Sequence, residues 1–124
     1  MRKLLLLLTS LSLLSCGSEK KDNTDATAEA TTPITPEETG KAIFEGKGNC
    51  YSCHRADEQS IGPAIKDISK IYKEKKGNIV SFLKEESDPI VDPEKYSLMK
   101  TNFYITKTFS DEELKAVEAY IYSH

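Results

Sequence analysis

The sequence of 124 residues has no excess of basic charge, few cysteines and no convincing alternation of apolar and polar residues of the kind that strands show. Its 17 Lys and Arg stand against 20 Asp and Glu, a net charge of −3, and no basic patch is evident. This balance argues against a nucleic-acid partner. A structural zinc ion needs four ligands, and beyond Cys50, Cys53 and His54 the chain offers only Cys16 near its start and His124 at its C-terminus, which form a poor second half-site.

A leucine-rich run from Leu4 to Leu14 follows Arg2 and Lys3 at the N-terminus. The run is too short to span a bilayer as a stable helix, so residues 1–15 are predicted to be an export signal. Without Arg2 and Lys3, 15 basic side chains would face 20 acidic ones, a charge of −5.

The signal closes on Leu13-Leu14-Ser15-Cys16, which resembles the bacterial lipobox, where a cysteine after a small residue is acylated and becomes the new N-terminus. The resemblance implies that Cys16 is a lipid anchor on the periplasmic side of a bacterial membrane. An ordinary secretory signal with an unrelated cysteine is the alternative, and both readings export the protein.

The stretch from Gly17 to Thr32 contains no large apolar side chain, so it cannot bury enough apolar surface to fold. We predict that residues 16–34 form a flexible tether with a reach of roughly 20–25 Å. The foldable domain is then 35–124. A domain of roughly ninety residues buries a modest fraction of its surface and often depends on a disulfide, a metal or a cofactor.

Helical signals dominate residues 35–124. Thr35-Pro36-Glu37-Glu38 is a capping box that predicts a helix through about Glu45, and Ser110-Asp111-Glu112-Glu113 opens a last helix with an apolar stripe. Apolar residues at helical spacing predict a helix from Ile65 to Gly77 and another from Asn78 to Ser87. We therefore expect a small all-α domain of about four short helices with long loops. The longest loop, 88–109, is of a length that is usually functional.

The motif Cys50-Tyr51-Ser52-Cys53-His54 indicates what kind of group the protein binds. Two thiols at this spacing can add to the vinyl groups of a haem while the following imidazole binds the iron from below. A thioredoxin-like dithiol would need a preceding strand, yet Gly46-Lys47-Gly48-Asn49 stands there. A structural disulfide in a protein without haem remains open. The motif predicts one covalently attached haem c, with His54 as an iron ligand.

Several features of the chain from Thr35 onward resemble the class I monohaem cytochromes c. Gly40 and Phe44 in the first helix, and Val117 and Tyr120 in the last, stand where this family crosses its terminal helices closely beside the haem. Ile61-Gly62-Pro63 matches the Gly-Pro of the family. The resemblance implies that the Pro63 carbonyl accepts the Nδ1 proton of the proximal histidine, which fixes its tautomer.

Met99, in the segment Tyr96-Ser97-Leu98-Met99, stands where the family carries its distal ligand, and it is the one Met outside the signal. A gap-filling core Met is the plain alternative. The family often places Pro after this Met, whereas this chain has Lys100. His124 competes as a ligand, although its place at a helix end favours a solvated role.

The remaining aromatic and basic side chains receive structural roles. Aromatic residues are expected to pack against the haem or between helices, with one Tyr hydroxyl reaching a haem propionate. They are Tyr51, Tyr72, Tyr96, Tyr104, Tyr120, Phe82, Phe103 and Phe109. The lysines that follow helical spacing are expected on a solvated face. They are Lys66, Lys70, Lys73, Lys75 and Lys76.

Together these features predict an exported, membrane-tethered, monomeric one-electron carrier with redox proteins as donor and acceptor. With His54 and Met99 as axial ligands the iron has no open position for a substrate, so we expect no enzyme activity. The alternative is a five-coordinate haem that binds a small gas or peroxide.

Overall fold

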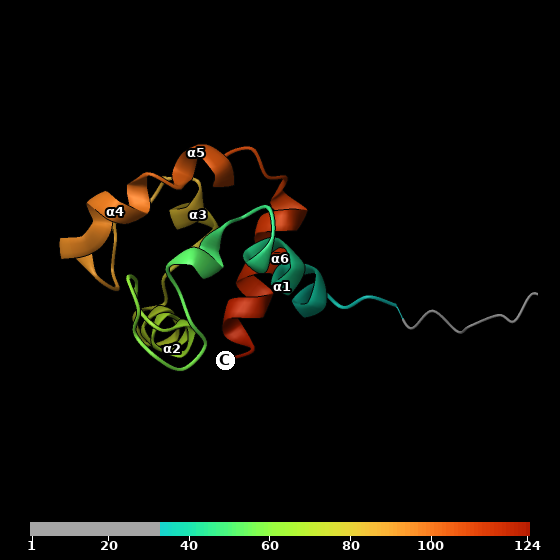
Figure 1. Ribbon diagram of the computed structural model, residues 1–124, viewed down its shortest axis with the longest axis horizontal. Coiled ribbons are helices and arrows are strands. Elements are labelled where there is room, and N and C mark those ends of the chain that lie inside the picture. The colour runs from blue at the N-terminus through green and yellow to red at the C-terminus, as the bar shows by residue number, and fades with distance from the viewer. Residues whose placement is uncertain (1–32) are drawn as a thin grey trace, which may run out of the picture. The chain divides into compact units, whose positions relative to one another are not determined.

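The computed structural model describes residues 33–124, so the predicted signal, Cys16 and nearly all of the predicted tether lie outside the described residues. Residues 33–124 form six α-helices and two 3₁₀ helices without any strand, which confirms the predicted all-α class (Figure 1). The elements are α1 (Pro36–Glu45), η1 (Cys50–Ser52), α2 (Ile65–Lys75), α3 (Ile79–Leu83), η2 (Pro93–Lys95), α4 (Tyr96–Lys100), α5 (Phe103–Thr106) and α6 (Asp111–Tyr122).

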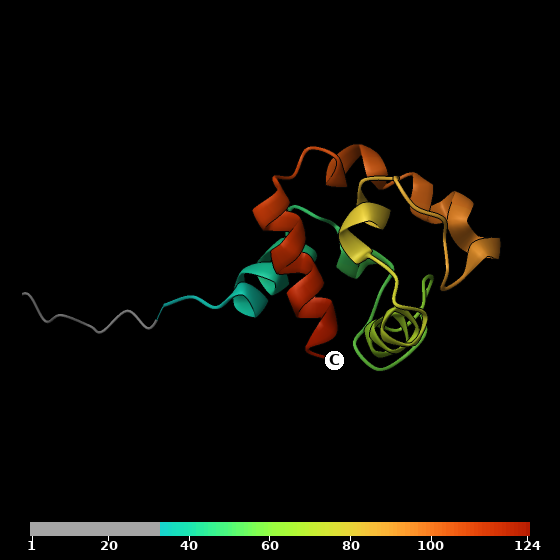
Figure 2. The same ribbon diagram turned by 180° about the vertical axis from the view of Figure 1, so that it is seen from behind.

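Helices α1 and α6 lie side by side in both views of the molecule (Figures 1 and 2). Both predicted capping boxes are formed, with Thr35 capping α1 and Ser110 capping α6. A Cβ atom at Gly40 would lie 1.9 Å from the Ala116 carbonyl oxygen, so only glycine permits this approach. Phe44 and Tyr120 meet edge to face with ring centroids 5.3 Å apart. The predicted close crossing of the terminal helices is confirmed.

The two middle helices are confirmed with shifted ends. Helix α2 ends at Lys75, and Lys76 rather than Gly77 takes the left-handed conformation, with φ of 52°. The Asn78 side chain caps α3 by accepting from the Ser81 N–H at 2.7 Å, as predicted. Helix α3 already ends at Leu83, four residues before the predicted end at Ser87.

The prediction of an irregular loop over 88–109 was wrong, because η2, α4 and α5 form within it. Asp92 caps the first of these turns by accepting from the Lys95 N–H at 3.3 Å. An aromatic cluster then holds the segment: Phe82 packs against Phe103 at 5.4 Å and against Tyr96 at 6.3 Å between ring centroids. Helices this short leave no readable periodicity, and tertiary packing stabilises them.

The predicted packing role is wrong for two aromatic side chains. Tyr104 is 74% exposed, and Tyr51 is exposed beneath the Arg55 guanidinium, 4.1 Å from the ring centroid. Tyr72 and Phe103 are buried in the core. The five lysines predicted on a solvated face of the chain are all exposed.

Candidate functional site

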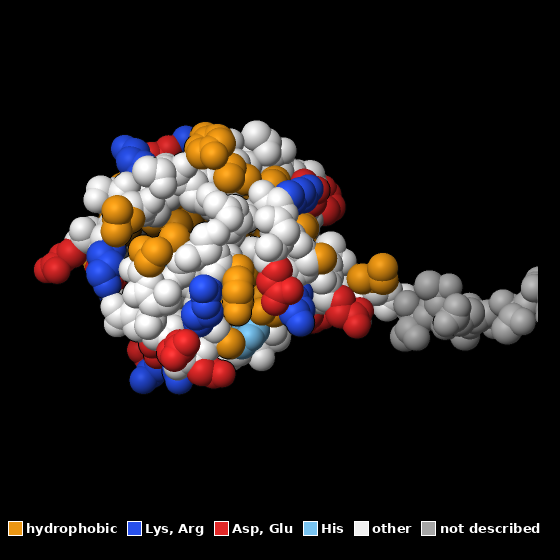
Figure 3. Space-filling model, viewed as in Figure 1, with side chains coloured by type: hydrophobic (Ala, Val, Ile, Leu, Met, Phe, Trp, Pro, Cys, Tyr) orange, Lys and Arg blue, Asp and Glu red, His pale blue; other side chains and the backbone are white. Residues whose placement is uncertain are grey.

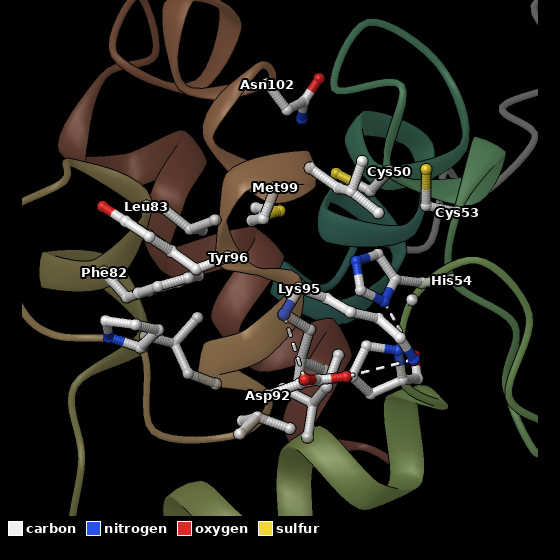
Figure 4. Close-up of a pocket in the computed structure, with 18 of the residues that line it drawn as sticks. Cys50, Cys53, His54, Phe82, Leu83, Asp92, Lys95, Tyr96, Met99 and Asn102 are labelled. Carbon is white, nitrogen blue, oxygen red and sulfur yellow. Dashed lines mark hydrogen bonds and ion pairs between the residues drawn. The ribbon is translucent and has the colours of Figure 1, made fainter.

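A pocket between the helices collects most of the predicted site residues (Figure 4). Its empty volume, counted with the solvent at its mouth, is about 1150 Å³. Figure 3 shows apolar side chains gathered where the surface is hollowed in the region of α3 and α4. Aliphatic and aromatic side chains form most of the lining, the usual character of a site for a large apolar ligand. They include Phe44, Ile61, Ile68, Tyr72, Ile79, Phe82, Leu83, Ile90, Val91, Tyr96, Leu98, Val117 and Ile121.

The η1 turn presents the two cysteines to this pocket. The Cys50 carbonyl accepts from the N–H groups of Cys53 at 3.1 Å and His54 at 3.0 Å, so the three residues form one rigid unit. Both thiols are free. The Cys50 thiol donates to the Gly48 carbonyl at 3.4 Å, and burial raises its pKa to about 11.

His54 lies in the same pocket with one tautomer fixed. Its Nδ1–H donates to the Pro63 carbonyl oxygen at 2.8 Å, because a carbonyl can only accept (Figure 4). Burial lowers the pKa of His54, while the bond to Pro63 partly opposes this shift. The ring therefore stays neutral with its Nε2 lone pair available, the form that binds a metal.

Gly62 supports the imidazole from one side, a contact that the sequence analysis did not anticipate. A Cβ atom at Gly62 would lie 2.5 Å from His54 Cε1 and 2.8 Å from Nδ1. The Gly62 N–H donates to the Cys53 carbonyl at 2.8 Å, which ties this backbone to the cysteine turn. Glycine is thus required here for close approach to the ring.

Met99 lines the pocket from α4 and is partly buried (Figure 4). The structure places it on a short helix rather than in the irregular loop that the sequence predicted. His124 does not line this pocket; its Nδ1 lies 3.0 Å from the Tyr120 carbonyl oxygen, at the end of its own helix. Met99 therefore shares the pocket with His54, and His124 does not.

Two polar features of the pocket escaped the sequence analysis. Asn102 Nδ2 donates to the Gly48 carbonyl at 3.0 Å, which joins the end of α4 to the segment before Cys50. Lys95 and Asp92 form an ion pair of 3.3 Å in the pocket wall (Figure 4). None of these three side chains belongs to a motif, so only the folded chain could identify them.

The residues present fit a haem c. Two free thiols, a neutral imidazole and a thioether all reach one pocket with apolar walls. Within residues 33–124, by contrast, no group of three or more His, Cys, Asp or Glu side chains is placed to hold a metal ion by itself.

The family model for cytochrome c matches residues 37–124. The chain therefore belongs to the cytochrome c family, and it is a c-type haem electron carrier. Its cofactor is covalently bound haem c, with which the spacing of Cys50 and Cys53 agrees. A comparison with curated proteins found no significant match.

Cytochrome c domains typically transfer electrons rather than catalyse a reaction, and they are generally exported. No helix within residues 33–124 is long and apolar enough to cross a membrane.

Proposed function

We propose that this protein carries single electrons through a haem c bound to Cys50 and Cys53, with His54 and Met99 as the axial ligands. The observation that carries the proposal is that His54 and Met99 line one pocket together with both cysteines. When bound, haem c supplies the couple between Fe(III) and Fe(II).

The protein's own residues prepare the site for this role. The Pro63 carbonyl accepts from the Nδ1–H of His54 and so holds the ring, which leaves the Nε2 lone pair free to bind the haem iron. The apolar walls keep water out, and a thioether ligand favours the reduced metal, so both raise the reduction potential. Two axial ligands leave no position for a substrate, which supports an electron carrier over an enzyme.

The visible spectrum of the reduced holoprotein tests the axial ligands. We expect the spectrum to stay unchanged when carbon monoxide is added, because Met99 fills the sixth position. A large spectral change at low carbon monoxide concentration would instead indicate a five-coordinate haem. In that case the alternative function, the binding of a small gas or peroxide, would replace the electron carrier.

We also propose that Cys16 anchors the protein to a membrane, facing the bacterial periplasm. The lipobox-like ending Leu13-Leu14-Ser15-Cys16 supports this, although Cys16 lies outside the described residues. The partners would be redox proteins that supply and accept electrons. The protein would act as a monomer, with no nucleic-acid partner.

Substitution of the anchor residue tests this attachment. We expect Cys16→Ala to abolish incorporation of labelled fatty acid and to release the domain from the membrane or block its processing. Ser15→Ala is the matched control, since it keeps a small residue before the cysteine and should still be labelled. Processed wild-type protein that takes up no label and fractionates with the soluble periplasm would contradict the lipid anchor.

A further inference from the structure

We infer that Glu85 is a positioning residue for Met99: its carboxylate holds α4 in place through Lys100 and Lys107. This inference rests on the proposed ligation by Met99. Because α4 is only five residues long, its contacts with the rest of the fold decide how steadily it presents the thioether.

The carboxylate of Glu85 bridges two lysines. Its Oε1 lies 3.4 Å from the Nζ atom of Lys100, the residue directly after Met99, and its Oε2 pairs with Lys107. The Glu85 side chain is 23% exposed, whereas that of Lys100 is 59% exposed. Each lysine favours the ionised form of Glu85 and lowers its pKa. One carboxylate thus fixes both ends of the segment from Lys100 to Lys107.

Backbone hydrogen bonds fix the turn that carries Glu85. Glu85 takes the left-handed conformation with φ of 60°, which is uncommon for a residue with a side chain. Its N–H donates to the Phe82 carbonyl at 2.9 Å, and the next N–H donates to the Ser81 carbonyl at 2.8 Å. The turn therefore fixes the carboxylate to the end of α3, whose Leu83 lines the pocket.

Besides the bond from Asn102, just past its end, to the Gly48 carbonyl, helix α4 has few other attachments. Tyr96 packs at its first residue against Phe82 and Phe103, with ring centroids 6.3 and 5.9 Å apart. At its last residue, the pair of Lys100 with Glu85 is the only hydrogen bond or ion pair that an α4 side chain makes to another element in the described part of the chain. Met99 lies between these two points, so the pair limits movement of the thioether away from the pocket.

A surface ion pair contributes little to global stability. The same pair makes up a larger share of the free energy of a local opening, because such an opening breaks only a few contacts. Loss of the Glu85 charge should therefore leave the fold intact while raising the fraction of molecules in which Met99 has moved away. Salt should act in the same direction on the wild type, because it screens the pair.

Imidazole binding to the oxidised holoprotein measures this opening, since imidazole must displace Met99 to reach the metal. We expect Glu85→Gln to bind imidazole about three- to fivefold more tightly than the wild type, with an unchanged far-UV circular dichroism spectrum. Added salt should tighten imidazole binding to the wild type more than to the variant. Glu74→Gln is the matched control, because Glu74 pairs with Lys70 on α2 at 4.0 Å and should leave imidazole affinity unchanged.

Lys100→Gln supplies a second variant that leaves Glu85 paired with Lys107. It should also tighten imidazole binding, and it keeps the test open if Glu85→Gln does not fold. Wild-type affinity in both variants, in a protein that shows the sulfur-to-iron charge-transfer band, would overturn the inference and leave Met99 ligation standing. A wild-type protein without that band would overturn Met99 ligation, and the inference with it.

Discussion

Replacement of both Cys50 and Cys53 by alanine should give a protein that holds no covalent haem and folds poorly. Cys50 is 8% exposed within the core, and the pocket beside it is lined by apolar side chains from α1, α2, α3 and α6. Without the macrocycle these walls would face water or collapse, which costs several kcal/mol on the scale of about 5–15 kcal/mol that stabilises a small domain. Mass spectrometry of the intact protein and far-UV circular dichroism measure the two effects.

Two controls make the result of the cysteine substitution specific. Ser52 lies between the two cysteines and is exposed, so the Ser52→Ala variant should retain both the haem mass and the helical signal. Each single cysteine variant should keep one thioether bond, and a smaller fraction of its molecules should carry haem. Haem that survives acid extraction in the double variant would exclude thioether bonds at these positions. A wild-type protein with the mass of the bare chain and a Cys50–Cys53 disulfide would support the structural-disulfide alternative.

Local sequence signals predicted the frame of the domain. Both capping boxes act over four residues, so the starts of α1 and α6 could be read directly from Thr35 and Ser110. The close crossing of these helices was implied by the resemblance to class I cytochromes c, and the structure supplies its reason, because only a residue without a side chain fits where Gly40 meets Ala116. The thiols and imidazole of the attachment motif are neighbours in sequence, so their approach needs only one turn of chain.

The other side of the pocket depends on contacts between distant residues. Helix α4 exists because Tyr96 packs on Phe82 and Phe103, and no periodic pattern marks five residues. Asn102 donates a hydrogen bond to a residue 54 positions away in the sequence. Glu85 pairs with lysines up to 22 positions away, and neither Asn102 nor Glu85 belongs to a motif. Sequence reasoning therefore predicted a role for Met99 from its residue type and from its place in the family pattern, and not from the element that carries it.

Removal of the thioether should change function far more than fold. We expect Met99→Ala to lose the weak sulfur-to-iron charge-transfer band in the red to near-infrared that the oxidised wild type should show. Thioether ligation favours Fe(II), so its loss should lower the reduction potential on the order of 100–200 mV. For one electron, 59 mV corresponds to about 1.4 kcal/mol, so this shift equals about 2–5 kcal/mol of lost stabilisation of the reduced state. Potentiometric titration and absorption spectra measure both changes.

Ser97→Ala is the matched control for this substitution. Ser97 lies on the same helix two residues before Met99, is exposed and does not line the pocket, so Ser97→Ala should keep the band and a potential near that of the wild type. The Met99→Ala variant should also bind carbon monoxide and imidazole, while its far-UV circular dichroism stays close to that of the wild type, because the thioethers and His54 still hold the haem. An unchanged potential with no new ligand binding would mean that another side chain, or none, occupies the sixth position. If no side chain occupies it, the five-coordinate alternative would replace the carrier with His and Met ligands. If another side chain does, the haem would remain six-coordinate with a different sixth ligand.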